Sequence, residues 1–169
     1  MIDLSFQGNS QIGTLVHIRV RVDAVNTDKM ASSPLQIMRQ VMQHISKTKG
    51  FDRVMNKVQV VSAEPGKCVF EMKVAEEHLN LPGDSSRRLN GDLVDGLTTY
   101  ALLSMEGGKP GVSVDLHVSY LKAAKPGETI TIAAEVLKMG RTLAYTTAQI
   151  KNEQGDVIAQ GLHTKHVGN

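Results

Sequence analysis

The apolar run between residues 89 and 105 constrains the fold more than any other feature of the chain. Its apolar side chains recur at helical spacing, and Gly107 and Gly108 end the run. The second half of the run is apolar on nearly every side, so the sequence predicts a helix that other elements must bury. The side chains at helical spacing are Leu89, Leu93, Leu97, Tyr100 and Leu103.

Alternating runs typical of β-strands supply the cover for this helix. Residues 57–74 form two such runs, joined by a turn with Pro65 and Gly66 at its centre, which predicts a hairpin. These runs and those that follow the helix predict an α+β fold, an antiparallel β-sheet wrapped around a long central helix. The later strand patterns, each bounded by glycine or proline, cover residues 111–121, 128–140, 142–152 and 156–167.

A second helix is predicted within residues 30–50. Ser32 or Ser33 can cap it, Pro34 suits its first turn, and Gly50 can end it. Its apolar residues share one face, which we interpret as core packing. They are Leu35, Met38, Val41, Met42 and Ile45.

Residues 1–29 differ from the rest of the chain. Residues 14–25 alternate as a strand would, but the residues before them show no clear period. We therefore expect residues 1–29 to be an N-terminal extension whose order the pattern leaves open, and residues 30–169 to be the folded domain. Met30 is an alternative start of the protein.

Composition excludes several classes of function. The 169 residues are 41% hydrophobic, enough for one domain with its own core. The 19 basic and 17 acidic residues are too balanced for nucleic-acid binding. The single cysteine, Cys68, excludes an intrachain disulfide and suits a reducing compartment.

The sequence also predicts where in the cell the protein is located. No apolar stretch approaches the roughly 20 residues that span a bilayer, so we expect a soluble protein without membrane insertion. We expect a cytoplasmic location, with the mitochondrion as the alternative. Residues 1–29 are a weak mitochondrial presequence, because they carry as many aspartates as basic residues.

Asp95 is the main candidate for catalysis. It is an acidic residue in an apolar setting, between Leu93-Val94 and Leu97. A partly buried carboxylate is typical of a general base that works near neutral pH. The alternative is that Asp95 points to solvent on a polar stripe with Asp92 and Thr99.

Other polar residues carry weaker signals. Ser113 lacks the surrounding pattern of a serine-hydrolase nucleophile. His163 and His166 fall on opposite faces of a strand, which is unsuitable for a shared metal, and we interpret both as ordinary strand residues. Four basic residues end the late strands, where they are solvated or hold the phosphates of a nucleotide-like carrier: Lys122, Lys125, Lys138 and Arg141.

The segments "VSAEPGKCVFEMKVAEEHLN", "LVDG", "PGVSVDLHVSYL" and "IAQGLHTKHVGN" carry a family resemblance. Over about residues 35–169 the chain resembles the hot-dog-fold acyl-coenzyme A thioesterases. The resemblance implies fatty acyl-CoA hydrolysis without a metal or other cofactor. It also implies a homodimer, usually doubled to a homotetramer.

The resemblance assigns roles to individual residues. Asp95 of "LVDG" matches the general base that activates water. Asn80 matches the side chain that helps to place the thioester carbonyl or the water, and Ser113 matches a residue that orients the water. In such dimers the loop with the asparagine and the helix with the aspartate come from opposite subunits.

The resemblance also implies a CoA-binding surface of two segments with a nearby histidine. Its residues are Tyr120, Leu121, Lys122, Ala123, Ala124, Lys125, Lys138, Met139, Gly140, Arg141, Thr142, Leu143 and His166.

One stretch departs from the family pattern. Where the family reads approximately GTLHGGLTAT, residues 83–92 read GDSSRRLNGD. The family histidine falls on Ser86 and its two glycines on Arg87 and Arg88. The first glycine normally offers the backbone N–H of the oxyanion hole. Arg87 keeps that N–H, but two long side chains at the start of the helix are expected to obstruct the substrate.

Three interpretations of this stretch follow. The chain is an active thioesterase, or a catalytically impaired hot-dog module that binds acyl-CoA or a partner protein. A phosphate-binding loop made of Arg87 and Arg88 is disfavoured, because no glycine-rich nest accompanies them.

The origin of the stretch is a separate question. Synonymous codons can be chosen for Asp84–Asp92 so that the same bases, read in a frame shifted by one base, encode the family motif. A local frame shift is therefore our hypothesis for its origin, and resequencing of the gene and transcript tests it.

Overall fold

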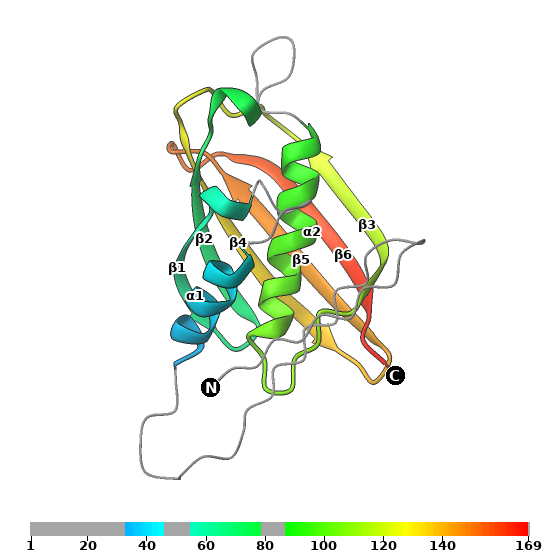
Figure 1. The fold of residues 1–169 in the computed structure, drawn as a ribbon. Coiled ribbons are helices and arrows are strands. Elements are labelled where there is room, and N and C mark those ends of the chain that lie inside the picture. Colours follow the sequence, from blue (N-terminus) through cyan, green and yellow to red (C-terminus); the bar gives the residue numbers. More distant parts are fainter. Residues whose placement is uncertain (1–32, 46–54, 79–86, 169) are drawn as a thin grey trace, which may run out of the picture. The chain divides into compact units, whose positions relative to one another are not determined.

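The computed structural model describes residues 33–45, 55–78 and 87–168 (Figure 1). The extension at residues 1–29, the predicted helix end at Gly50, and Asn80 all lie outside the described residues.

The predicted central helix is confirmed as α2, Arg87–Leu103, which lies across one face of the sheet (Figure 1). Leu93, Leu97 and Ala101 are fully buried, as their helical spacing requires. Gly107 has a φ of 65°, which a side chain would disfavour, and the chain turns there towards the next strand. The helix contacts five of the strands, so the sheet provides the cover that its apolar surface demands.

The strands of the described residues form one six-stranded antiparallel sheet in the order β1-β2-β4-β5-β6-β3. The predicted strands and the α+β class are therefore confirmed. The bounds are β1 Gln59–Glu64, β2 Lys67–Lys73, β3 Val112–Tyr120, β4 Thr129–Met139, β5 Leu143–Lys151 and β6 Val157–His166.

The predicted hairpin joins β1 to β2 through Pro65 and Gly66. Gly66 has a φ of 77°, the left-handed conformation that the third position of a type II turn requires. Its N–H donates to Ser104 Oγ at 2.9 Å, and Ser104 Oγ donates to Glu64 O at 3.0 Å. The hairpin turn is thus tied to the residue that follows α2.

The first predicted helix is α1, Pro34–Ile45, and it contacts β1. Ser33 is its cap, because Ser33 Oγ accepts from Gln36 N at 3.3 Å and Gln36 Oε1 accepts from Ser33 N at 3.0 Å. This reciprocal pair is a capping box. Met38 and Met42 are buried, which confirms the predicted apolar face at these two positions.

Gly161 lets β6 approach α2 closely. A Cβ at this position would overlap the Val94 side chain, so a larger residue would push the helix away from the strand. The close approach brings the inward side of β6 against the middle of α2, where Asp95 lies.

The edge strand β3 is unusual in its exposure. A β-bulge between Ser113 and Asp115 shifts its register, so that Ser113 pairs with Lys165 and Leu116 with His163. Ser113, Leu116 and Tyr120 therefore face the helix side of the sheet. Leu116 is still 40% exposed and Tyr120 44% exposed, so α2 leaves this apolar strip uncovered.

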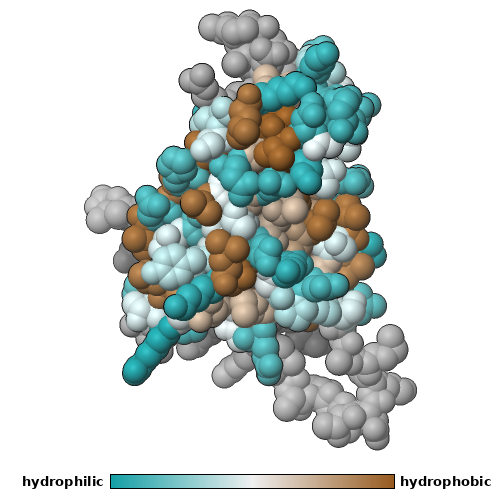
Figure 2. Space-filling model, turned by 180° about the vertical axis from the view of Figure 1, so that it is seen from behind, coloured by the Kyte–Doolittle hydropathy of each residue, from teal (hydrophilic) through white to brown (hydrophobic). Residues whose placement is uncertain are grey.

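The opposite face of the sheet mixes polar and apolar residues (Figure 2). Its exposed apolar residues include Tyr145 and Leu162. Among the described residues, no helix is long and apolar enough to cross a membrane.

Candidate active site

Asp95 lies at the edge of the buried surface of α2. Its neighbours Leu93, Val94 and Leu97 are fully buried, but the Asp95 side chain is 35% exposed. It does not point to solvent on a polar stripe. Its carboxylate faces three polar side chains from β3 and β6, and the alternative that the pattern left open is thus excluded.

Ser113 is the first of these partners. Its hydroxyl donates to Asp95 Oδ1 at 3.0 Å. The bulge that follows Ser113 aims both this hydroxyl and Leu116 towards the helix side, which regular alternation along β3 would not do. Strand irregularities that re-aim a side chain are common beside active sites.

His163 extends the network beneath Ser113. Its Nε2 lies 2.9 Å from Ser113 Oγ and 3.4 Å from Asp95 Oδ1, and its Nδ1 lies 2.7 Å from Thr98 Oγ1. The interpretation of His163 as an ordinary strand residue was wrong, because its side chain is fully buried at the site. His166 lies on the other face of β6.

A single arrangement places one hydrogen in each contact between His163, Ser113 and Asp95. His163 Nε2–H donates to Ser113 Oγ, and Ser113 donates to Asp95 Oδ1, which leaves Nδ1 without a hydrogen. Thr98 Oγ1 lies 2.7 Å from both His163 Nδ1 and the Val94 carbonyl oxygen, and its one hydrogen serves one of these acceptors at a time. With the proton on Nδ1 instead, either the Ser113–His163 or the Ser113–Asp95 contact would lack a hydrogen. The hydrogen bonds from His163 through Ser113 therefore run in one direction and end on the Asp95 carboxylate.

The imidazole of His163 is neutral at neutral pH. Burial and, to a smaller extent, the positive charge of Lys165 lower the pKa of His163 from 6.5 to about 4, against the carboxylates of Asp95 and Asp115, which raise it. A neutral imidazole can donate from Nε2 to Ser113 while its unprotonated Nδ1 faces Thr98 Oγ1.

Lys165 brings a buried positive charge to the site. Its side chain is 6% exposed, and its Nζ lies 4.0 Å from Asp95 Oδ1. Nζ also donates to Thr99 Oγ1 at 2.7 Å, while Thr99 Oγ1 donates to the Asp95 backbone carbonyl at 2.8 Å. Burial lowers the pKa of Lys165, and the Asp95 charge opposes that shift.

The first turn of α2 lies about two turns before Asp95 on the same helix. The helix begins at Arg87, so the Arg87 N–H belongs to the first-turn amides, which have no acceptor within the helix. The Arg88 side chain is 84% exposed and lies 3.8 Å from Asp92. Within one chain, the Arg88 side chain thus points into solvent, and the expected obstruction of the substrate stays a prediction.

Comparison with known proteins places this arrangement in a family. Residues 92–159 match the model of the Thioesterase superfamily. The chain is 49% identical over 139 residues to acyl-coenzyme A thioesterase 13 of Homo sapiens, covering 82% of this chain and 99% of the human protein. The chain belongs to the thioesterase superfamily.

Solved structures of thioesterases agree with this assignment. Zebrafish thioesterase superfamily member 2 superimposes with a TM-score of 0.77 at 47% identity, covering 82% of this chain and 100% of that chain. A hypothetical thioesterase of Streptococcus pneumoniae, solved with coenzyme A, has a TM-score of 0.62 at 26% identity. The match covers 66% of this chain and 90% of the Streptococcus pneumoniae chain. The hot-dog fold predicted from the sequence is confirmed.

The residues that depart from the thioesterase motif fit their surroundings poorly. Asn90 is 3% exposed, and its Oδ1 has no hydrogen-bond partner among the described residues. Asp92 is partly buried, which raises its pKa, as does the nearby charge of Asp95, against the attraction of Arg88. The family pattern has threonine at both positions.

We expect Asn90→Thr to stabilise the protein by about 1–2 kcal/mol, because it removes an unpaired buried carbonyl oxygen. A threonine hydroxyl can donate to a carbonyl of the preceding helical turn. Urea unfolding measures the change, with an increased midpoint at constant slope. Asn90→Ala is the matched control and should also stabilise, whereas lower stability in both variants would contradict the prediction.

The structure places the predicted CoA-binding residues in two groups. Leu143 pairs with His166, and the N–H of Val167 donates to Thr142 O at 2.8 Å, so residues 138–143 and His166 lie together. Tyr120 is at the far end of β3, about 27 Å along the strand from Val112, which also pairs with His166. One chain therefore does not bring residues 120–125 to the other group.

Of two further predicted site residues, the structure describes Lys122 but not Asn80. Lys122 forms an ion pair with Asp156 at 2.6 Å, so part of its charge is balanced within the chain. Asn80 is outside the described residues, but the adjoining short helix η3, Glu76–His78, is described. There, His78 Nδ1 accepts from the Ala75 N–H at 3.1 Å.

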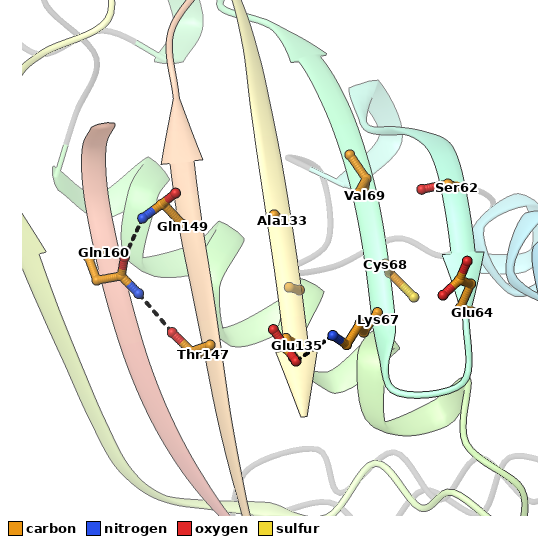
Figure 3. A pocket seen from close by; sticks show the side chains of 11 residues that line it. Ser62, Glu64, Lys67, Cys68, Val69, Ala133, Glu135, Thr147, Gln149 and Gln160 are labelled. Carbon is orange, nitrogen blue, oxygen red and sulfur yellow. Dashed lines mark hydrogen bonds and ion pairs between the residues drawn. The ribbon is translucent and has the colours of Figure 1, made fainter. Parts of the chain in front are cut away.

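A shallow groove of about 450 Å³ lies on the opposite face of the sheet (Figure 3). Lys67 and Glu135 form an ion pair there at 2.9 Å, and Gln160 bonds to Gln149 and Thr147. The groove contains none of the predicted site residues. Among the described parts of the chain, no cluster of three His, Cys, Asp or Glu side chains could hold a metal ion.

The sequence pattern alone did not identify Thr98, His163 or Lys165. A signal was present, because His163 and Lys165 are two residues apart on a strand and so share a face. The face that they share is the one that Gly161 brings against α2.

Proposed function

We propose that this protein hydrolyses fatty acyl-CoA thioesters to a free fatty acid and CoA. The observation that carries the proposal is the hydrogen-bonded Asp95 carboxylate in a chain 49% identical to an acyl-coenzyme A thioesterase. A partly exposed carboxylate held by Ser113 on one oxygen can use its other oxygen to take a proton from water.

In the proposed reaction each group has one task. The Arg87 backbone N–H, with Asn80, polarises the thioester carbonyl. Asp95 takes a proton from water as the water oxygen bonds to the carbonyl carbon, and negative charge gathers on the carbonyl oxygen. When this intermediate collapses, the C–S bond breaks, and CoA leaves as a thiol with the proton held by Asp95.

Ser113 positions the reacting groups in this scheme. Its hydroxyl hydrogen is directed at Asp95 Oδ1, and its oxygen accepts from His163. Ser113 therefore fixes the orientation of the carboxylate and, through it, the position of the water. No covalent serine intermediate is needed, because water attacks the carbonyl directly.

The alternative is a catalytically impaired module that binds acyl-CoA or a partner protein, because Ser86-Arg87-Arg88 replaces the family motif. Release of free thiol from palmitoyl-CoA distinguishes the two functions. Turnover that Asp95→Asn abolishes supports the enzyme. Binding of palmitoyl-CoA by calorimetry without turnover supports the impaired module.

We further propose that the working unit is a homodimer formed through β3. An antiparallel pairing of β3 with its copy would cover the exposed strip of Leu116 and Tyr120. It would also bring residues 120–125 of one chain towards residues 138–143 of the other, which completes the CoA surface. A homotetramer would use the opposite face of the sheet, where Tyr145 and Leu162 are exposed.

We expect Leu116→Arg to yield a monomer and to reduce hydrolysis at least tenfold, because a charged side chain in the strip opposes its burial. Light scattering after size-exclusion chromatography measures the mass. Leu162→Arg, on the opposite face, is the matched control and should keep the dimer. A fully active monomeric Leu116→Arg protein would contradict the proposal.

A further inference from the structure

Lys165 is a buried lysine on the helix side of β6. It pairs with Ser113 on β3 and Ala144 on β5, and its side chain is 6% exposed. A lysine so deeply buried is costly to the fold unless its charge is compensated. The groups that surround the Lys165 ammonium must therefore compensate its charge.

The ammonium group faces Asp95 from two directions. Directly, Nζ is 4.0 Å from Asp95 Oδ1, the oxygen that also accepts from Ser113. Indirectly, Nζ donates to Thr99 Oγ1, which donates to the Asp95 backbone carbonyl. Both contacts hold Asp95 in place. Its other carboxylate oxygen, Oδ2, has no hydrogen-bond partner among the described residues.

The other charges around Lys165 do not replace Asp95. His163, two residues away on the same face of β6, is neutral because burial lowers its pKa to about 4. The carboxylate of Asp115 acts on His163 from β3, which lies beside β6. Asp95 is the carboxylate that acts on Lys165.

We infer that Lys165 is a positioning residue of the proposed thioester hydrolysis. Its buried ammonium is the counter-ion of Asp95, and it turns Oδ1 towards the strands so that Oδ2 faces the water. The inference rests on the proposed function, in which Asp95 is the base. It assigns a task to a residue that touches neither the thioester nor the water.

Lys165→Met tests the inference, because methionine fills a similar apolar volume without charge. We expect kcat to fall about tenfold or more, with the KM for palmitoyl-CoA unchanged, because orientation is lost but binding is not.

A matched control separates this effect from the general loss of a lysine. Lys67→Met removes a lysine that is also on a strand and also ion-paired, with Glu135 at 2.9 Å, but that lies on the opposite face of the sheet. We expect its kcat and KM to match those of the unmodified protein. A Lys165→Met enzyme with an unchanged kcat would overturn the inference.

Thermal unfolding tests the same pairing without any activity. We expect Asp95→Asn to lower Tm by roughly 5 °C, because it leaves Lys165 buried without its counter-ion. Adding Lys165→Met should restore Tm, because the uncompensated charge is removed. Equal and additive losses of Tm would show that the two residues are not coupled and would overturn the inference. If Tm is restored but no variant hydrolyses palmitoyl-CoA, the pairing holds and the proposed function fails.

Discussion

Asp95→Asn should reduce the kcat for palmitoyl-CoA by about a thousandfold, within the range that general-base catalysis contributes. The reason is specific to this site. An asparagine can still accept the Ser113 hydroxyl on its Oδ1, so the local arrangement is retained while the ability to take a proton from water is lost. Free-thiol release in the steady state measures kcat.

Binding should survive this substitution, because Asp95 is not part of the predicted CoA surface. Calorimetry with palmitoyl-CoA should give an affinity within about threefold of that of the unmodified protein, less than 1 kcal/mol. Glu135→Gln, which removes a carboxylate from the opposite face, is the control and should leave kcat unchanged. An Asp95→Asn protein with near-normal kcat would exclude Asp95 as the base.

The sequence predicted the architecture well because its patterns are local. The helix across residues 89–105 and the hairpin at Pro65-Gly66 depend on periodicity and turn chemistry alone, and both are confirmed. Asp95 was found in the same way, as an acidic residue within an apolar helical face. The direction of its side chain could not be predicted, because Asp95 lies at the boundary of that face.

The partners of Asp95 were harder to predict, for two physical reasons. Hydropathy would turn Leu162 inward, yet Leu162 is 51% exposed, while His163 and Lys165 are buried. The face of β6 is set by pairing with its neighbours rather than by its own pattern. The bulge after Ser113 also breaks the alternation of β3, and a bulge leaves little trace in a single sequence.

The stretch at residues 83–92, which departs from the family motif, differs from the rest in another way. Here polar side chains occupy buried positions of the fold. Asn90 is buried with an unpaired oxygen, and Asp92 is a partly buried carboxylate close to a second one. Natural sequences usually agree with their fold at each level. Among the described residues, the buried side-chain atom without a hydrogen-bond partner lies in the stretch that departs from the family motif, as the frame-shift hypothesis expects and an adaptation of the site does not.

Restoring the family motif should raise kcat about tenfold to a hundredfold. Glycine in place of Arg87 would let the substrate carbonyl approach the backbone N–H that should bind the oxyanion. The remaining changes should repair the packing, and a Cβ at Gly91 would meet the Tyr120 hydroxyl at an acceptable 3.7 Å. The substitutions are Asp84→Thr, Ser85→Leu, Ser86→His, Arg87→Gly, Arg88→Gly, Asn90→Thr, Gly91→Ala and Asp92→Thr.

Partial restorations separate access to the oxyanion hole from packing. Arg87→Gly with Arg88→Gly should recover most of the gain in kcat but lower stability, because each glycine costs about 1 kcal/mol within a helix. Asn90→Thr with Asp92→Thr should instead raise stability with little change in kcat. If the fully restored protein and the chain as it stands hydrolyse palmitoyl-CoA equally fast, the first turn of α2 does not limit catalysis. The Arg87 N–H would then be as accessible to the thioester as that of the glycine it replaces.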